Sequence, residues 1–167
     1  MLPDNLETTF RREGDSTDAT RSLPLRAGPL RLLFEDGGLR YIKLGDIEII
    51  RRIYVAVRDR NWGTVPTRVA VLHRDVRTDF FQIVTETETQ DDEIDYVWRS
   101  TIDGTADGTI FFTMEGEARS NFLRNRIGFC VLHPSHECQG AHCRIRGERG
   151  EWTDGGFPQH IAPENPF

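Results

Sequence analysis

An Asp-Gly turn between two apolar runs occurs twice in this chain, and it constrains the fold more than any other feature. The runs 30–34 and 39–44 flank Asp36-Gly37-Gly38, and the runs 96–102 and 109–118 flank a segment with two Asp-Gly steps. Asp-Gly tolerates the positive φ angles that tight hairpin turns require. We therefore expect two antiparallel hairpins, one in each half of the chain.

Further strands are expected from runs rich in β-branched residues, at 47–57, 69–71, 80–89, 126–132 and 144–146. In the run 80–89, Thr85, Thr87 and Thr89 alternate with glutamates, as in a strand with one buried face. Arg51-Arg52 predicts a bulge or a sheet edge, residues 61–66 predict a turn, and residues 118–123 predict the only helical turn.

The spacing of these runs predicts the fold class. About eight strands at intervals of about ten residues, without alternating helices, are typical of an all-β antiparallel sandwich. We expect this domain to span residues 23–156. The polar segment 1–22 predicts a flexible arm. The proline-containing segment 157–167 predicts the start of a connection to a downstream domain.

Composition narrows the classes of partner. The 21 basic and 27 acidic residues give a net charge of −6, which argues against a nucleic-acid or anionic-membrane partner. No apolar run approaches the roughly 20 residues of a membrane span, and no secretory signal precedes the strands. We expect a cytoplasmic protein without a cofactor, in which the cysteines Cys130, Cys138 and Cys143 are reduced thiols.

The segment 133–143 is the densest cluster of metal-ligand residue types. It offers a possible metal site formed by His136, Cys138, His142 and Cys143. However, all four lie in one short segment, whereas zinc sites usually combine two separated pairs. We therefore expect no metal, and the alternative is a loop that packs against the end of the sandwich.

No known nucleophile or phosphate-binding motif occurs in the sequence. Glu115 and Glu117 share one face of a strand, as a carboxylate pair for acid-base chemistry would, but such pairs are more often a solvated face. A cysteine near His133 could form a nucleophile pair only if the fold brought the two together. We expect no catalytic residue here, and Glu115 and His133 are the candidates if there is one.

Sugar binding is the other chemistry that the sequence allows. Arg124 and Asn125 have side chains that hydrogen-bond to carboxylates or sugar hydroxyls. Trp62 and Trp152 could be exposed platforms for a sugar ring, whereas Trp98 alternates into a core position. Arg124, Asn125 and Trp62 are therefore the candidate substrate-binding residues.

Several segments resemble the N-terminal domain of the D-apionolactonase family. They are 28–34, 37–42, Gly45, Glu48, 51–54, 58–66, 116–118, 125–134 and 163–167. The resemblance covers about residues 24 to 167, and the stretch 126–134 is its most specific part. It implies a β-sandwich that precedes a barrel-like central domain and a further β domain.

The resemblance also implies an activity, the hydrolysis of D-apionolactone to D-apionate in the catabolism of apiose. It supplies no catalytic residue within this sequence, so we expect the active site to lie in the central domain, which this domain would support. The sandwich is also similar to the large sandwich domains of mutarotases and glycosidase accessory domains, a likeness of fold alone. A free carbohydrate-binding or mutarotase-like module is therefore the alternative.

Overall fold

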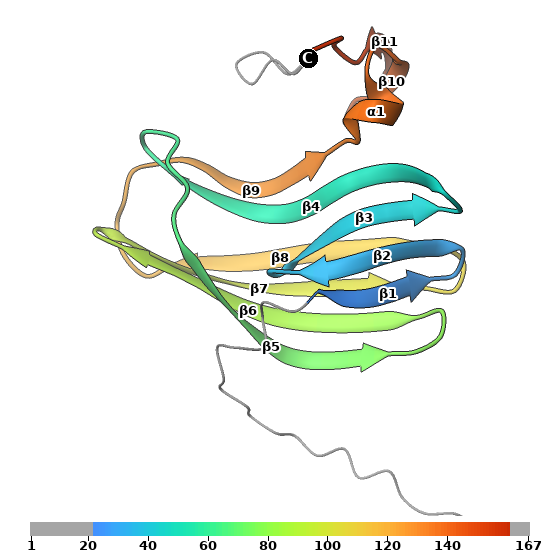
Figure 1. Cartoon of the computed structure of the whole chain (residues 1–167). Coiled ribbons are helices and arrows are strands. Elements are labelled where there is room, and N and C mark those ends of the chain that lie inside the picture. Colours follow the sequence, from blue (N-terminus) through green and yellow to red (C-terminus); the bar gives the residue numbers. More distant parts are fainter. Residues whose placement is uncertain (1–21, 161–167) are drawn as a thin grey trace, which may run out of the picture.

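The computed structural model describes residues 22–160 of the chain (Figure 1). Eleven strands and one short helix lie in this part. Their bounds are β1 (Leu23–Ala27), β2 (Leu30–Glu35), β3 (Gly38–Leu44), β4 (Ile47–Asp59), β5 (Thr67–Val76), β6 (Phe81–Asp91), β7 (Ile94–Gly104), β8 (Ile110–Ala118), β9 (Arg124–Leu132), α1 (Ser135–Cys138), β10 (His142–Arg146) and β11 (Trp152–Gly156).

Two antiparallel sheets form the body of the domain. The first has the strand order β1-β2-β3-β4-β9, and the second has the order β5-β6-β7-β8. Figure 1 shows them as two layers, with β4 crossing to the second layer through a loop into β5 and β8 returning to the first through β9. The small β10-β11 hairpin and α1 lie beyond the end of β9. The expected all-β sandwich is confirmed.

Both predicted hairpins are present. At the first, Asp36 and Gly37 have φ angles of 51° and 71°, as a two-residue turn with right-handed strand twist requires. At the second, β7 pairs with β8 from Tyr96 opposite Ala118 to Gly104 opposite Ile110. Each turn therefore sets the register of the pairs next to it, and the β2–β3 ladder shifts register once, between Arg31 and Leu33.

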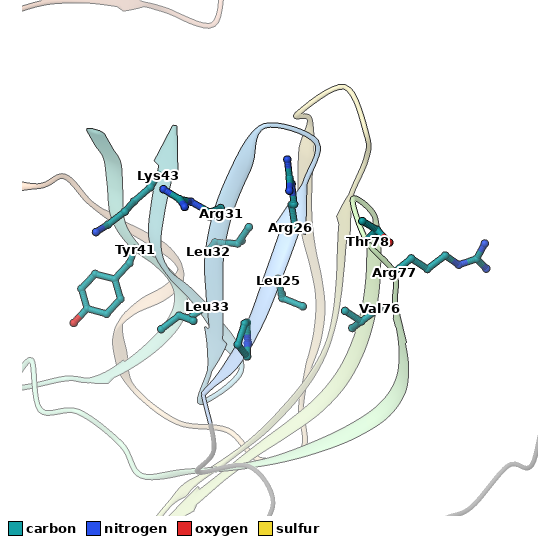
Figure 2. Close-up of a pocket in the computed structure, with 11 residues that line it drawn as sticks. Leu25, Arg26, Arg31, Leu32, Leu33, Tyr41, Lys43, Val76, Arg77 and Thr78 are labelled. Atoms are coloured by element: carbon teal, nitrogen blue, oxygen red, sulfur yellow. The ribbon is translucent and has the colours of Figure 1, made fainter. Parts of the chain in front are cut away.

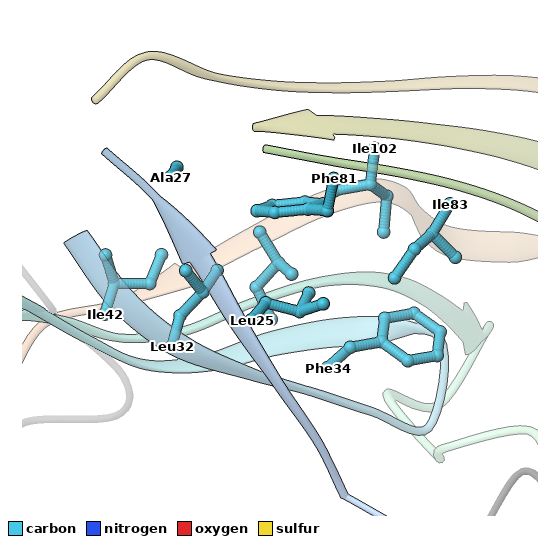
Figure 3. Packing of buried hydrophobic residues seen from close by; sticks show 9 residues of the cluster. Leu25, Ala27, Leu32, Phe34, Ile42, Phe81, Ile83 and Ile102 are labelled. Carbon is cyan, nitrogen blue, oxygen red and sulfur yellow. The ribbon is translucent and has the colours of Figure 1, made fainter. Parts of the chain in front are cut away.

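The core lies between the two sheets and has two clusters. Figure 3 shows side chains of β1, β2 and β3 facing those of β6 and β7 in the first cluster, where Leu39, Phe81, Ile83 and Ile102 are completely buried. The second cluster surrounds Trp98 at the other end of the sandwich and includes Val57, Val65, Ile94 and Tyr96. Burial of these apolar surfaces is the main force that holds the sheets together.

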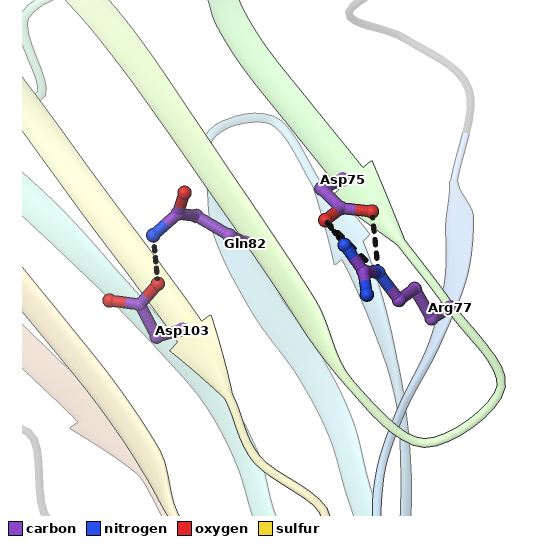
Figure 4. Close-up of polar contacts among 4 residues, drawn as sticks. All are labelled: Asp75, Arg77, Gln82 and Asp103. Atoms are coloured by element: carbon purple, nitrogen blue, oxygen red, sulfur yellow. Dashed lines mark hydrogen bonds and ion pairs between the residues drawn. The ribbon is translucent and has the colours of Figure 1, made fainter. Parts of the chain in front are cut away.

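Strand β6 shows how alternation sorts the side chains. Phe81, Ile83, Thr85, Thr87 and Thr89 point into the core and are buried. The residues between them lie on the outer face, where the amide of Gln82 donates a hydrogen bond to Asp103 across β6 and β7 at 2.8 Å (Figure 4). The expected alternation of this strand is therefore confirmed.

An exposed ion pair lies at the end of β5, in the same sheet. The guanidinium group of Arg77 donates to the carboxylate of Asp75 at 2.8 Å, as Figure 4 shows. This hydrogen bond holds the pKa of Asp75 below its usual range.

Two expectations about local structure were wrong. Residues 118–123 are not helical, because Ser120 instead accepts a hydrogen bond from the backbone N–H of Asp95 and donates one to the carbonyl of Glu93. The short helix is Ser135–Cys138. Arg51-Arg52 is not at the bulge, because the register shift with β3 lies at residues 48–50 of β4, and Arg52 pairs with both β3 and β9.

Strands β1 and β11 were not anticipated, since β1 contains Pro24 and four of the five residues of β11 are polar or glycine. In the described part of the chain, no helix is long and apolar enough to cross a membrane. The expected arm falls almost entirely, and the expected connection largely, on residues 1–21 and 161–167, which lie outside the described residues.

Candidate functional site

A polar hollow of the domain lies where β3 begins beside β4. We call it the step pocket. It has a volume of about 620 Å³, within the range of small-molecule sites. Both sheets line it, through Asp36, Gly37, Arg52, Tyr54, Val55, Ala56, Val57, Arg58, Thr64, Val65, Thr67, Arg68, Val69, Thr87 and Trp98.

The step pocket exists because neighbouring strands differ in length. The ladder between β3 and β4 ends where Leu39 pairs with Ile53, whereas β4 continues to Asp59 and pairs with β9 along its other edge. The turn at Gly37 that closes the β2–β3 hairpin rests against Val69 of the second sheet, where an added Cβ would lie 3.2 Å from the valine side chain. The last part of β4 thus has one open edge.

The loop between β4 and β5 forms the second wall of the step pocket. One carboxylate oxygen of Asp59 accepts the backbone N–H groups of Asn61 and Gly63, at 2.7 and 2.8 Å. The loop then returns to β4, where Thr64 bridges to Arg58 and its hydroxyl accepts a hydrogen bond from the guanidinium group. These contacts turn the loop back over the open strand edge.

The polar lining of the step pocket is mainly cationic. Arg52, Arg58 and Arg68 contribute three guanidinium groups, and Asp36 contributes the one carboxylate. The guanidinium group of Arg52 stacks on the ring of Tyr54 at 4.3 Å from its centroid. Its Nε atom is buried without a hydrogen-bond acceptor in the described part of the protein. An arrangement of this kind can hold a small anion or a polar molecule with an acidic group.

A second hollow lies on the outer face of β1, β2 and β3, beside the β5–β6 turn (Figure 2). Its volume is about 560 Å³ and its lining is mostly apolar. Of its cations, Arg26 donates to the carbonyl of Gly28 at 2.7 Å, and Arg31 donates to the carbonyl of Gly45 at 2.7 Å. Arg77 points away from the other lining residues in Figure 2 and is paired with Asp75. Three of the four lining cations are thus engaged within the fold, Lys43 being the fourth, and the lining has less polar character than that of the step pocket.

The catalytic candidates do not meet. Glu115 lies on the outer face of β8, directly across from Arg99 of β7. His133 follows β9, and its ring centroid lies 5.0 Å from that of Phe157. Neither residue lines one of the two hollows described above. Their role stays a prediction that the fold does not strengthen.

The substrate-binding candidates converge on one end of the sandwich. Arg124 of β9 lies opposite Asp59 of β4 in the strand ladder. The backbone N–H of Trp62 donates to the carbonyl of Asp59 at 3.2 Å. Asn125 follows Arg124 and is also exposed. Trp62 has 62% of its surface exposed. Arg124 also lies near Tyr96, whose phenol pKa is raised by burial and partly lowered again by this charge.

The candidate metal ligands lie on α1 and the β10-β11 hairpin. His136 and Cys138 are on α1, and His142 and Cys143 are on β10. The imidazole Nε2 of His142 lies 3.2 Å from the carboxylate of Asp154. Burial raises the pKa of the Cys138 thiol. Across residues 22–160, no group of three or more such side chains is arranged to hold a metal ion.

The sequence analysis missed the step pocket. Arg52 and Arg58 were visible in the sequence, but the pocket depends on where the β3–β4 ladder stops, which no single motif encodes. A usable signal was the pattern at positions 52, 54 and 58, where arginine or tyrosine alternates with apolar residues of the core face. All three cysteines are free thiols, as expected.

Comparison with known proteins decides the family. The model of the N-terminal domain of D-apionate lactonase matches residues 10–167. The chain belongs to this family. A D-apionate lactonase of Brucella anthropi is 30% identical over 147 residues, which are 86% of this chain and 24% of that relative. The chain thus spans about a quarter of that relative's length. No solved structure matches the chain.

Membership of the D-apionate lactonase N-terminal domain family agrees with the resemblance found in the sequence. The match begins within the segment before β1 and continues through β11, so it includes both sheets and the step pocket. The strands that build the pocket are therefore part of the family domain.

Proposed function

We propose that this chain is the N-terminal β-sandwich domain of a sugar-lactone hydrolase that converts D-apionolactone to D-apionate during apiose catabolism. The observation that carries the proposal is the family match over residues 10–167, together with a relative called D-apionate lactonase. The domain contacts downstream domains of the same protein and supports an active site that one of them carries. The proposed location is the cytoplasm, which the three free thiols support.

The chemistry of the reaction supports an active site in another domain. Hydrolysis of a lactone requires a polarised carbonyl, an activated water and an acid that protonates the departing ring oxygen. Glu115 and His133 are the acid-base candidates here, and the fold holds them on different elements, β8 and the segment after β9. This separation supports placing the acid and the base outside this domain. No cofactor is needed for such a hydrolysis.

The test measures acid release from D-apionolactone by the 167-residue chain and by the same chain extended through its natural downstream sequence. We expect activity in the extended protein and none in the domain by itself. Activity in both would place the catalytic groups here and direct substitution to Glu115, Arg124 and His133. An extended protein that leaves the lactone intact would refute the lactonase proposal.

A free carbohydrate-binding or mutarotase-like module is the second candidate, and the exposure of Trp62 favours it. Trp152 is also 58% exposed, but guanidinium groups of Arg144 and Arg146 lie over its ring at 4.8 and 5.9 Å. Trp62 is therefore the more open platform. Titration of neutral sugars against tryptophan fluorescence tests it: a saturable change that Trp62→Ala abolishes supports the module, and its absence at millimolar sugar argues against it.

A further inference from the structure

We infer that the step pocket binds a polyhydroxy acid, with its carboxylate on the arginines of β4 and its hydroxyl groups on the polar residues around them. This is the chemical class to which the product of the proposed hydrolysis belongs. The choice of ligand class rests in part on the proposed function, whereas the charge and shape of the pocket do not.

The positive charge of the pocket lining supports an acidic ligand. Among residues 22–160, none of Arg52, Arg58 and Arg68 has a carboxylate within ion-pairing distance. Glu88, which lies opposite Arg68 in the ladder, pairs with Arg119 at 3.1 Å, and Glu35 pairs with Arg40 at 2.5 Å. Three arginines with one carboxylate in the lining leave an uncompensated positive charge, which an anion would neutralise.

The register of the sheet places a further positive charge beside Arg52. Arg52 of β4 lies directly opposite Arg40 of β3, and like charges in such a pair destabilise a sheet. Glu35 offsets the charge of Arg40, but Arg52 receives only the face of Tyr54. Its buried Nε–H has no acceptor, and leaving such a donor unsatisfied is costly. A carboxylate in the pocket would offset the charge of the Arg52 guanidinium group.

The rest of the lining suits the hydroxyl groups and the carbon chain of such an acid. Asp36 would repel a bare anion, but a carboxylate is the best acceptor for a sugar hydroxyl. Thr64 and Thr67 add hydroxyl groups, and Trp98 and Val57 provide an apolar floor for the carbon chain. A ligand with one acidic group and several hydroxyls satisfies all these groups together. Neither an inorganic anion nor a neutral sugar does so.

The experiment uses Trp98 as the reporter. The variant Trp62→Phe/Trp152→Phe keeps Trp98, which lines the pocket, as the only tryptophan. We expect D-apionate and D-gluconate to change its fluorescence saturably, ribitol to have no effect at the same concentrations, and sulfate to bind more weakly than either acid. Calorimetry on the unsubstituted chain measures the same dissociation constants without relying on the reporter.

Substitutions test whether the arginines hold the acid. Arg52→Gln and Arg58→Gln should each weaken binding at least about tenfold, the loss typical of one charge-assisted hydrogen bond. Arg68→Gln, at an exposed position, should also weaken binding and provides a variant with little risk to folding. The matched control is Arg74→Gln, which removes an exposed arginine from the same strand β5 outside the pocket and should leave affinity unchanged.

Three results would overturn the inference: no saturable binding of either acid, binding of ribitol or sulfate as tight as that of D-gluconate, or an equal loss of affinity in the Arg74→Gln control. The lactonase assay on the extended protein separates this inference from the proposed function. An active extended protein whose step pocket binds no acid would refute the inference alone. Acid binding that Arg52→Gln removes, in a protein without lactonase activity, would refute only the proposed function.

Discussion

Two threonines on one strand offer a direct test of how the sandwich core tolerates polar groups. Thr85 and Thr89 both lie on the inward face of β6, with 0% and 1% of their surface exposed. The hydroxyl of Thr89 donates to the carbonyl of Pro66 at 2.8 Å. The hydroxyl of Thr85 has no partner in the described structure, although it lies opposite Ser100, whose hydroxyl is also unpaired. The same substitution should therefore have opposite effects at the two positions.

The magnitudes follow from the hydrogen bonds. Thr85→Val removes a buried hydroxyl without a partner and adds a methyl group to the core, so we expect the free energy of unfolding to rise by about 1 kcal/mol. Thr89→Val removes a hydrogen bond and leaves the Pro66 carbonyl without its donor, so we expect a loss of about 1.5 kcal/mol. Each variant is the matched control of the other, because strand, face and burial are the same.

Urea denaturation followed by circular dichroism measures both effects. With a slope of about 2 kcal/mol per molar urea, the midpoint should rise by about 0.5 M for Thr85→Val and fall by about 0.7 M for Thr89→Val. The slope itself should not change. If Thr85→Val lowered the midpoint as much as Thr89→Val, the hydroxyl of Thr85 would have a partner and the reasoning would be wrong.

Three further predictions concern other parts of the fold. Gly28→Ala should lower the free energy of unfolding by more than about 2 kcal/mol, because Gly28 has a positive φ and an added Cβ would overlap the carbonyl oxygen of Ala106. The control is Gly45→Ala, which also has a positive φ but open space around it and should cost about 1 kcal/mol. Thermal denaturation measures both. Hydrogen bonds from its own turn lower the pKa of Asp107, so its contribution to the free energy of unfolding is present above pH 3.8 and is lost as the pH falls through the lowered pKa. The difference in stability between Asp107→Asn and the unsubstituted chain should therefore vanish in acid. A difference that stays constant with pH would contradict this. Cys138, whose thiol pKa is raised by burial, should react with iodoacetamide more slowly at pH 8 than free glutathione does, as peptide mass spectrometry can show.

Much of the fold follows from local sequence. The φ angles that Asp36-Gly37 adopts allow only a tight turn of the hairpin type, and the alternation from Phe81 to Thr89 allows only one face to be buried. Family membership was also visible in short segments of sequence, because the family model matches the residues that form these strands. These features depend on neighbours within a few positions, so the sequence determines them directly.

The helix illustrates the limit of such reasoning. Residues 118–123 lack strong strand signals, yet they do not form a helix, because Ser120 and Phe122 find partners in β7 and in the preceding turn. Ser135–Cys138 forms one turn of helix in a polar segment with no apolar period. Both outcomes depend on contacts that a window of a few residues does not contain.

The sequence by itself determined the two Asp-Gly hairpins and which side chains of β6 are buried, because these are consequences of backbone φ angles and a period of two. Only the tertiary structure decided that Arg52, Arg58 and Arg68 share one pocket. That pocket forms beside the start of β3, where β4 continues past the last pair of the β3–β4 ladder, and residues of β5 in the other sheet also line it. Strand length and sheet order are set by the packing of distant segments, so a site built on them exists only in the folded chain.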